Sequence, residues 1–465
     1  MSDESRILLL SDLFQRQELS PVEVAQSQLE AIAERDQGIN SFCYLDEEAT
    51  IRMARDSETR HRNGRALGPL DGVPISVKDT VNVSGWPTRR GSLTSSAEPV
   101  AADAISVRRL REAGAVLVGK TTTPEFAWKG VTDSPLCGVT RNPLDRSLTA
   151  GGSSGGASAA VALGIGVMAI GTDAAGSVRI PSAFCGTVGF KPSFGRIPLD
   201  PFPTGFFQLP HIGPITATVA DAAISTTIMA GPSASDWTSL RHGEFSAMLS
   251  DIEADLPELR IGVMGAENLA HLAPDVAAGW SDFRATLEAQ GHGTIEIDLP
   301  FSQARDVAGL FYRIGCMEAV RQVAEDHLDR LDPGLLEFIA PVHDLTSDGL
   351  ISLCRSREQI ANRAAAALVS EADVIITPAM GVMAPTIAEL ERPGQAARWL
   401  DWNLFTPMFN VAHGPAISVP WPSPSGLPIG IQVAAAPGRD LAALRVARRI
   451  ERLSGYRPAS LAMRT

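Results

Sequence analysis

The chain has 465 residues, of which 45% are hydrophobic and 20% are charged. A chain of this composition can bury a large core, which excludes wholesale disorder and fibrous repeats. Its 40 basic and 53 acidic residues give a net charge of -13, which repels phosphate backbones and argues against a nucleic-acid partner.

The N-terminus opens with acidic rather than basic residues, and the most apolar stretch, residues 157–171, is shorter than the roughly 20 residues that a membrane helix needs. We therefore expect no membrane span. Five widely spaced cysteines without a C-x-x-C pair predict neither disulfides nor a zinc site, and a reducing cytoplasm is the simplest location. The scattered histidines predict no metal site or other cofactor, and His211 and His413 are expected to be pocket or core residues.

In chain order, the first predicted element is a helix that starts at Pro21, after a capping box formed by Ser20 and Glu23. An amphipathic helix over residues 104–113 then leads into a β-like run at 115–118. Helical periodicity recurs at residues 276–289, 301–328 and 441–453, and buried strands are predicted at 73–77, 259–263, 374–377 and 429–434. This alternation predicts one large domain of the α/β class.

Lysine and glycine are distributed unevenly. Only four of the 40 basic residues are lysines, and all four lie between positions 78 and 191. A buried lysine can lose its proton whereas arginine cannot, so these lysines are candidates for proton chemistry. Eleven of the 41 glycines lie within residues 151–195, where backbone freedom would serve a tight catalytic loop.

Three segments carry residues suited to acyl transfer. Residues 149–157, TAGGSSGGA, place Ser153 and Ser154 among four glycines before an alanine-rich helix. Residues 171–181, GTDAAGSVRIP, set Ser177 behind small residues whose N–H groups can converge on an oxyanion. Upstream, residues 68–80, GPLDGVPISVKDT, place Lys78 at the end of a predicted strand.

Together these segments resemble the amidase signature family, whose hallmark is a GGSSGG-type stretch followed by G-T-D-x-x-G-S-x-R-x-P, with an upstream lysine in a G-V-P-x-x-V-K-D context. The spacing also fits, because Ser177 lies 24 residues after Ser153 and 99 after Lys78. Flanking matches occur at residues 113–121, 124–126, 184–186, 189–192, 415–420 and 426–430.

The resemblance implies a mixed central β-sheet covered by helices on both faces, within a single domain over residues 1–465. Residues 66–230 would form the signature core that carries the catalytic residues. Residues 231–370 show little family pattern and are expected to bind substrate, and residues 371–465 would complete the sheet.

By the same resemblance, Ser177 is the nucleophile, Ser153 is a bridging serine that follows a cis peptide bond from Gly152, and Lys78 is the base. Lys78 must be neutral to accept a proton, so burial has to lower its pKa. The oxyanion would be held by the N–H groups of Ala174, Ala175, Gly176 and Ser177. Supporting roles would fall to Ser154, Thr172, Asp173 and Arg179.

The implied activity is hydrolysis of a carboxylic acid amide to an acid and ammonia or an amine, through a serine acyl-enzyme. An aromatic, proline-bounded loop follows the catalytic segment, and such a lining would favour a neutral, fairly hydrophobic small amide. The candidate pocket residues are Trp128, Gly152, Phe202, Phe206, Phe207 and Cys316. The expected partner is a small amide, with a homodimer as a further expectation.

Alternative interpretations are weaker. Residues 151–155 match G-x-S-x-G, but the turn-like residues 142–147 precede them where an α/β-hydrolase elbow requires a strand. Residues 164–169 resemble a dinucleotide fingerprint but lie where a helix is expected to end. No S-x-x-K motif is present.

Two alternatives remain within the same fold. One is a glutamyl-tRNA amidotransferase of the A-subunit type, although residues 120–126 and 206–213 depart from the sequence motifs typical of those proteins. The other is a catalytically silent scaffolding member, which the intact Lys78, Ser153 and Ser177 argue against.

Overall fold

The computed structural model describes residues 5–457 except 202–203, 241–244, 248 and 255–258. Eleven strands form one mixed sheet in the order β1-β3-β2-β8-β10-β9-β14-β15-β13-β11-β12. Its strands are β1 (Phe42–Tyr44), β2 (Pro74–Lys78), β3 (Val116–Thr121), β8 (Met168–Asp173), β9 (Val188–Lys191), β10 (His211–Thr216), β11 (Ile261–Met264), β12 (Thr294–Ile297), β13 (Val374–Pro378), β14 (Ala416–Trp421) and β15 (Ile429–Ala435). The predicted fold class is confirmed.

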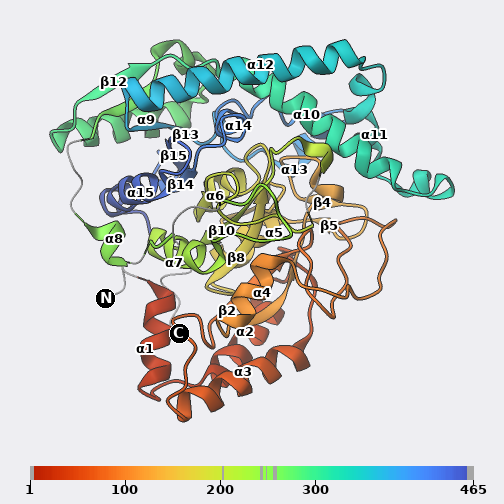
Figure 1. The fold of residues 1–465 in the computed structure, drawn as a ribbon, viewed down its shortest axis with the longest axis vertical. Helices are drawn as coiled ribbons and strands as arrows, with labels where there is room; N and C mark the ends of the chain where they lie inside the picture. Colours follow the sequence, from red (N-terminus) through yellow and green to blue (C-terminus); the bar gives the residue numbers. More distant parts are fainter. Residues whose placement is uncertain (1–4, 202–203, 241–244, 248, 255–258, 458–465) are drawn as a thin grey trace.

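Helices surround this sheet (Figure 1). The α-helices are α1 (Arg6–Gln15), α2 (Pro21–Arg35), α3 (Glu47–Arg62), α4 (Ile105–Glu112), α5 (Gly155–Ala162), α6 (Arg179–Cys185), α7 (Val219–Met229), α8 (Leu249–Glu253), α9 (Pro274–Ala289), α10 (Phe301–Arg321), α11 (Pro333–Ile339), α12 (Ser347–Ala366), α13 (Ile387–Leu390), α14 (Thr406–Val411) and α15 (Asp440–Ser454). Short 3-10 turns are η1 (Glu125–Ala127), η2 (Thr204–Phe206), η3 (Ala266–His271), η4 (Glu325–Arg330), η5 (Ala340–Val342) and η7 (Ala396–Arg398), and η6 (Ala367–Glu371) is a π-helical turn.

The order of strands divides the sheet by sequence position. Strands drawn from residues 42–216 occupy one side, and strands drawn from residues 261–435 occupy the other. The two sides join where β9 pairs antiparallel with β14, with Phe190 opposite Ile417. Distant parts of the chain therefore share one sheet.

Side-chain alternation separates the helix layers on the two faces. Met168 and Ile170 of β8 belong to the core cluster that includes side chains of α4 and α7, whereas Ala169 between them packs in a cluster with side chains of α5. In β2, Ile75 and Val77 belong to the α4–α7 cluster. Because strand side chains alternate, Lys78 is directed toward the α5 layer.

Two local predictions need correction. The helix expected over residues 301–328 ends at Arg321, and Glu325–Arg330 form a separate 3-10 turn, because this charged segment has no apolar face to bury. Residues 142–147 are not a simple turn. They belong to a two-stranded hairpin, β6 (Arg141–Asn142) and β7 (Asp145–Thr149), so a strand does precede the serine-rich loop.

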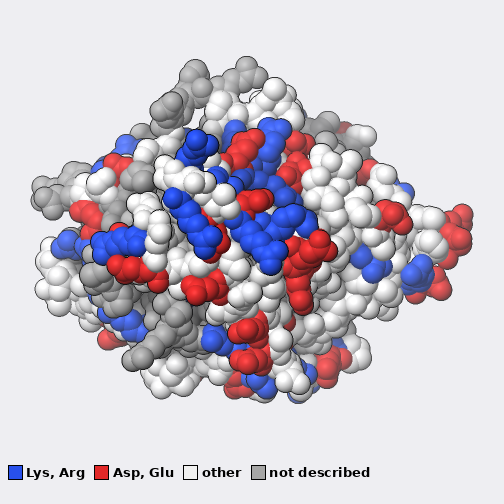
Figure 2. All heavy atoms as spheres, turned by 90° about the horizontal axis from the view of Figure 1, so that it is seen from below, with Lys and Arg blue, Asp and Glu red and all other residues white. Residues whose placement is uncertain are grey.

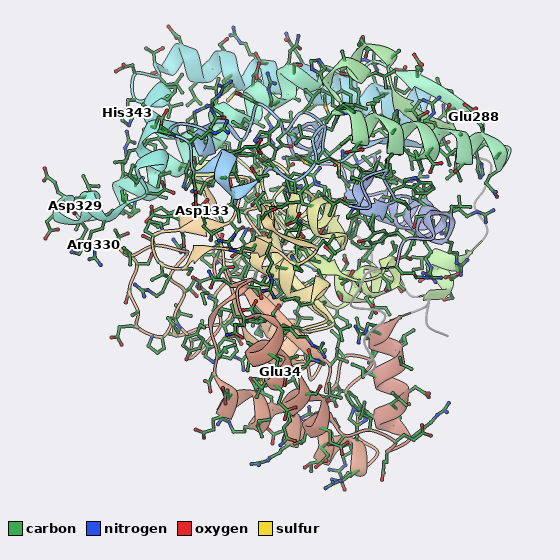
Figure 3. The ribbon with its side chains drawn as sticks, turned by 180° about the vertical axis from the view of Figure 1, so that it is seen from behind. Glu34, Asp133, Glu288, Asp329, Arg330 and His343 are labelled. Carbon is green, nitrogen blue, oxygen red and sulfur yellow. The ribbon has the colours of Figure 1, made fainter. Side chains whose placement is uncertain are left out.

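The region between α10 and α11 projects from the body of the molecule (Figure 1), and Figure 3 labels Asp329 and Arg330 at its tip. The Arg330 side chain donates to the carbonyl of Leu93 at 3.0 Å, which ties this projection to the N-terminal part. A second small hairpin, β4 (Asp133–Ser134) with β5 (Gly138–Val139), completes the strands.

The surface below α1–α3 carries both signs of charge. Figure 2 shows basic and acidic side chains interspersed over this face. Ion pairs within α3 include Arg52 with Glu48, at 3.3 Å, and Arg62 with Glu58, at 3.1 Å. None of the helices in the described part of the chain has the length and apolarity that a bilayer crossing requires.

Candidate active site

Lys78 ends β2 and is fully buried. Its Nζ lies within hydrogen-bond distance of three hydroxyl oxygens: Ser153 Oγ at 2.7 Å, Thr172 Oγ1 at 2.8 Å and Ser154 Oγ at 3.0 Å. Burial lowers the pKa of Lys78 well below its ordinary value, and the charge of Asp173 only partly opposes this shift. The lysine is therefore biased toward the neutral form that can accept a proton.

Glycines shape the loop that carries the two serines. Gly151 has φ of 76°, in the left-handed region, and the Gly152–Ser153 peptide bond is cis. A Cβ on Gly152 would lie 2.6 Å from the backbone of Val131, so only glycine fits there. Ser154 caps α5, and its N–H donates to the Ser177 carbonyl at 3.1 Å, which fixes this loop beside the Ser177 loop.

Ser153 and Ser177 both line a cavity of about 400 Å³. Its walls come from loops after β2 and β8, from η1 and η2, and from one face of α10. The remaining lining residues are Thr80, Val81, Arg90, Phe126, Ala127, Thr172, Asp173, Ala174, Leu199, Asp200, Pro201, Gly205, Phe206, Pro210, Ile212, Tyr312, Gly315, Glu318, Ala319 and Gln322. Among the described residues, no cluster of His, Cys, Asp and Glu is arranged to hold a metal ion.

Asp173, which lines the cavity, forms a fully buried ion pair with Arg179, with two N···O distances of 2.9 Å. Burial opposes ionisation of Asp173, but the charge and hydrogen bonds of Arg179 outweigh it and hold the pKa of the carboxyl below its usual range. Asp173 also accepts the N–H of Gly176 at 2.7 Å and that of Val178 at 3.2 Å. The pair therefore fixes the loop that presents Ser177.

This arrangement changes the expected oxyanion site. The N–H of Gly176 points to Asp173 Oδ1 rather than to the cavity, so Gly176 does not fit the donor role predicted for it. Ala174 and Ser177 line the cavity, and Ala175 lies between them with its carbonyl held by Asn403 and Thr406.

Of the five expected pocket residues that the structure describes, Phe206 lines the cavity and the other four do not. Trp128 is in the core, where its Nε1 donates to Asp332 at 3.2 Å and its ring packs on Phe338. Phe207 turns away and packs on Phe311 with ring centroids 4.8 Å apart. Cys316 is fully buried within α10, behind the lining positions.

Gly152 contributes close packing rather than a lining surface, because its Cα faces the Val131 backbone. Phe202 falls outside the described residues. His211 and His413 are buried or half-buried side chains that do not line the cavity.

Tyr312 was not predicted from the sequence. This side chain is buried on α10 and lines the cavity, and its hydroxyl donates to the carbonyl of Ala127. Burial raises the pKa of Tyr312 well above its ordinary value, so the hydroxyl stays protonated. The sequence did contain a relevant pattern, because Tyr312 and Gly315 are three positions apart in a predicted helix and therefore lie on the same face of it.

Comparison with known proteins assigns the chain to a class. The sequence profile of the Amidase family matches residues 23–444. An acylamidase of Rhodococcus erythropolis is 35% identical over 441 residues, covering 93% of this chain and 92% of that protein. The A subunit of a glutamyl-tRNA(Gln) amidotransferase from Chloroflexus aggregans is 31% identical over 465 residues, covering 94% of each.

The crystal structure of a bacterial aryl acylamidase of the amidase signature family superposes with a TM-score of 0.87 at 26% identity, covering 98% of each chain. The chain that carries this fold and the buried lysine–serine arrangement therefore matches the Amidase family over most of its length. The chain belongs to the amidase signature family. It is an amidohydrolase that acts on carbon–nitrogen bonds.

Proposed function

We propose that the protein hydrolyses small carboxylic acid amides through an acyl-enzyme on Ser177, with Ser153 as the proton shuttle and Lys78 as the base. The observation that carries this proposal is the fully buried Lys78, whose Nζ lies 2.7 Å from Ser153 Oγ beside the cavity that Ser177 lines. A neutral amine in this place can draw a proton from serine without a histidine.

In the first step, Ser177 Oγ attacks the amide carbonyl and its proton passes through Ser153 to Lys78. N–H groups of Ala174, Ala175 and Ser177 stabilise the oxyanion. Ser153 then protonates the leaving nitrogen, the carbon–nitrogen bond breaks, and ammonia or an amine departs. Water adds to the acyl-enzyme by the same relay, which releases the acid and restores the Ser177 hydroxyl.

The substrate is a neutral, fairly hydrophobic small amide. Apolar side chains such as Val81, Phe126 and Phe206 line the cavity, and charged Arg90 and Glu318 also contribute. The relatives named as acylamidases fit this class. We further propose that the region 231–370 supplies the specificity wall. Four lining residues, Tyr312, Gly315, Glu318 and Ala319, lie on α10, and a fifth, Gln322, directly follows it.

Fluorophosphonate labelling tests the relay. Such a probe should attach to Ser177 in the unsubstituted protein, and Ser177→Ala should abolish the labelling. The labelled peptide, identified by mass spectrometry, should contain residue 177. Labelling at another serine, or none, would contradict the proposed mechanism and favour a silent scaffolding role.

The second candidate is a glutaminase of the amidotransferase A-subunit type, which the similarity to the Chloroflexus aggregans protein favours. Hydrolysis of an aryl amide and of glutamine at equal concentration separates the two. We expect the aryl amide to be the better substrate, because the apolar wall formed by Val81, Phe126 and Phe206 buries an aryl group but offers no side-chain hydrogen-bond partner to the polar head of glutamine. Glutamine preferred by about tenfold would support the amidotransferase interpretation.

We also propose that the enzyme works in the cytoplasm as a homodimer. The five cysteines are all free, which fits a reducing compartment. Light scattering should give the mass of a dimer, and fractionation of the source cells should recover the activity in the cytosol.

A further inference from the structure

Phe206 is held tightly against α10. Its ring meets Tyr312 edge to face with centroids 5.3 Å apart, and it covers the backbone of Gly315. A Cβ on Gly315 would lie 2.4 Å from the Phe206 ring, so any larger residue there would push the ring toward the cavity. The position of this ring therefore sets the size of one cavity wall.

The backbone that follows Phe206 adopts an unusual conformation. Phe207 and Gln208 have φ of 48° and 62°, in the left-handed region that non-glycine residues rarely occupy. Two such residues in succession persist only where neighbouring groups hold them. The structure shows those groups, because each of three consecutive carbonyls is bound by a side chain from a distant segment.

Arg357 of α12 donates to the carbonyl of Phe207. His413, which follows α14, has Nε2 3.0 Å from the carbonyl of Gln208. The carbonyl of Leu209 accepts from Asn410 Nδ2 at 3.3 Å and lies 2.7 Å from His211 Nδ1. We call Arg357, His413 and Asn410 the carbonyl clasp.

Within the carbonyl clasp, Arg357 is the connecting member. Its guanidinium also contacts His413 Nε2 and lies 5.7 Å from the ring of Phe311. Burial and the charge of Arg357 lower the pKa of His413 to about 3, so the imidazole is neutral above acid pH and carries a single N–H, which donates to the Gln208 carbonyl when it is on Nε2. Neither Arg357 nor His413 lines the cavity, and the proposed mechanism does not use them.

We propose that Arg357 is a positioning residue for substrate size: through the carbonyl clasp it holds the Phe206 ring against Gly315 and thereby fixes the wall of the amide-binding cavity. This inference rests on the proposed function for the identity of the ligand. Loss of Arg357 frees the Phe207 carbonyl and lets the ring move, so the cavity discriminates less between small and large amides.

The test measures binding rather than turnover. In a Ser177→Ala background, which cannot form the acyl-enzyme, calorimetry gives Kd for anilides whose acyl chains run from acetyl to octanoyl. Arg357→Met keeps the aliphatic stem and removes the donors. We expect the ratio between the tightest and the weakest Kd in the series to fall about tenfold. Arg355→Met, at an exposed position on the same helix, is the matched control and should leave the ratio unchanged.

A second variant tests the wall without touching Arg357. Gly315→Ala should weaken binding of the longest acyl chains about tenfold while the acetyl anilide binds as before, and adding Phe206→Ala should restore the long chains. An unchanged size profile in Arg357→Met, or an equal weakening of every anilide, would overturn the inference. Hydrolysis of the same anilides by the unsubstituted protein reports separately on the proposed function.

Discussion

At the scale of single residues, Lys78 explains why a histidine is unnecessary in this site. Its strand position directs the side chain into the α5 layer, where three hydroxyl groups surround the nitrogen. A permanently charged ammonium would suffer the full cost of burial, whereas the neutral amine does not. The same burial that destabilises the charge creates the base.

Removing this base should be severe. We expect Lys78→Ala to reduce kcat by at least about a thousandfold, because the base and the shuttle pathway are lost together. Ser153→Ala should be damaging but less so, since a water molecule can replace the shuttle hydroxyl. Single-turnover kinetics on an anilide measure both, and near-full activity of Lys78→Ala would refute the relay.

The lowered pKa of Lys78 also predicts the pH dependence. Lys78 must be neutral to accept a proton, so activity is lost as pH falls through its pKa and rises toward alkaline pH. Because that pKa lies below its ordinary value of about 10.4, the rising limb should be complete well before this pH. A pH profile of kcat/KM checks this, and an activity maximum near pH about 5 would contradict it.

At the scale of elements, local sequence signals predicted helix starts well. The start of α2 shows why: Ser20 Oγ accepts the N–H of Val22 at 3.0 Å, and the Glu23 side chain accepts the N–H of Ser20 at 2.9 Å. These hydrogen bonds join residues two or three positions apart, so the capping-box pattern can be recognised from the sequence alone. The capping box predicted there is confirmed.

Ser20→Ala should therefore destabilise the protein by about 1 kcal/mol, because N–H groups in the first turn of α2 lose their acceptor. Urea denaturation, followed by circular dichroism, measures the change. Ser27→Ala on the exposed face of α2 is the control and should cost nothing, because alanine favours a helix. Equal losses in both variants would show that the cap contributes no stability.

At the scale of the whole molecule, Arg179 joins segments that no local pattern connects. Besides Asp173, its guanidinium donates to the Thr406 carbonyl at 2.9 Å, to Asn410 Oδ1 at 2.5 Å and to Gln432 Oε1 at 2.7 Å. These partners lie more than 200 positions away in the sequence. Sequence motifs therefore predicted which residues form the site, but they could not predict contacts with such distant segments.

Dependence on long-range contacts also explains why the pocket residues were only partly predicted from the sequence. The sequence predicted Phe206 as one of several aromatic pocket candidates after the catalytic segment. Which of these side chains faces the cavity depends on the left-handed backbone at Phe207 and Gln208, which the sequence does not show. Tyr312 comes from a helix that enters the site through tertiary packing. The Gly176 N–H donates to Asp173 rather than to an oxyanion because the ion pair with Arg179 orients the Asp173 carboxylate, and this contact was likewise not predictable from the sequence.

Arg179→Met should cost about 3–5 kcal/mol of unfolding free energy, because it leaves Asp173 as a buried charge without its cation. Adding Asp173→Asn should recover part of the loss. Arg398→Met is the control, since its pair with Asp401 is exposed and worth less than about 1 kcal/mol. Denaturant titration compares the three, and a loss no larger than that of the control would contradict the assigned role.

The division of the sheet by sequence position has a consequence for synthesis of the protein. A ribosome completes β1–β10 long before β14, so β9 waits as a bare edge strand with unpaired N–H and C=O groups. Such an edge can pair with another nascent chain. Translation that stalls before residue 416 should therefore yield aggregating fragments, and chaperone demand should end only when β14 emerges and covers β9.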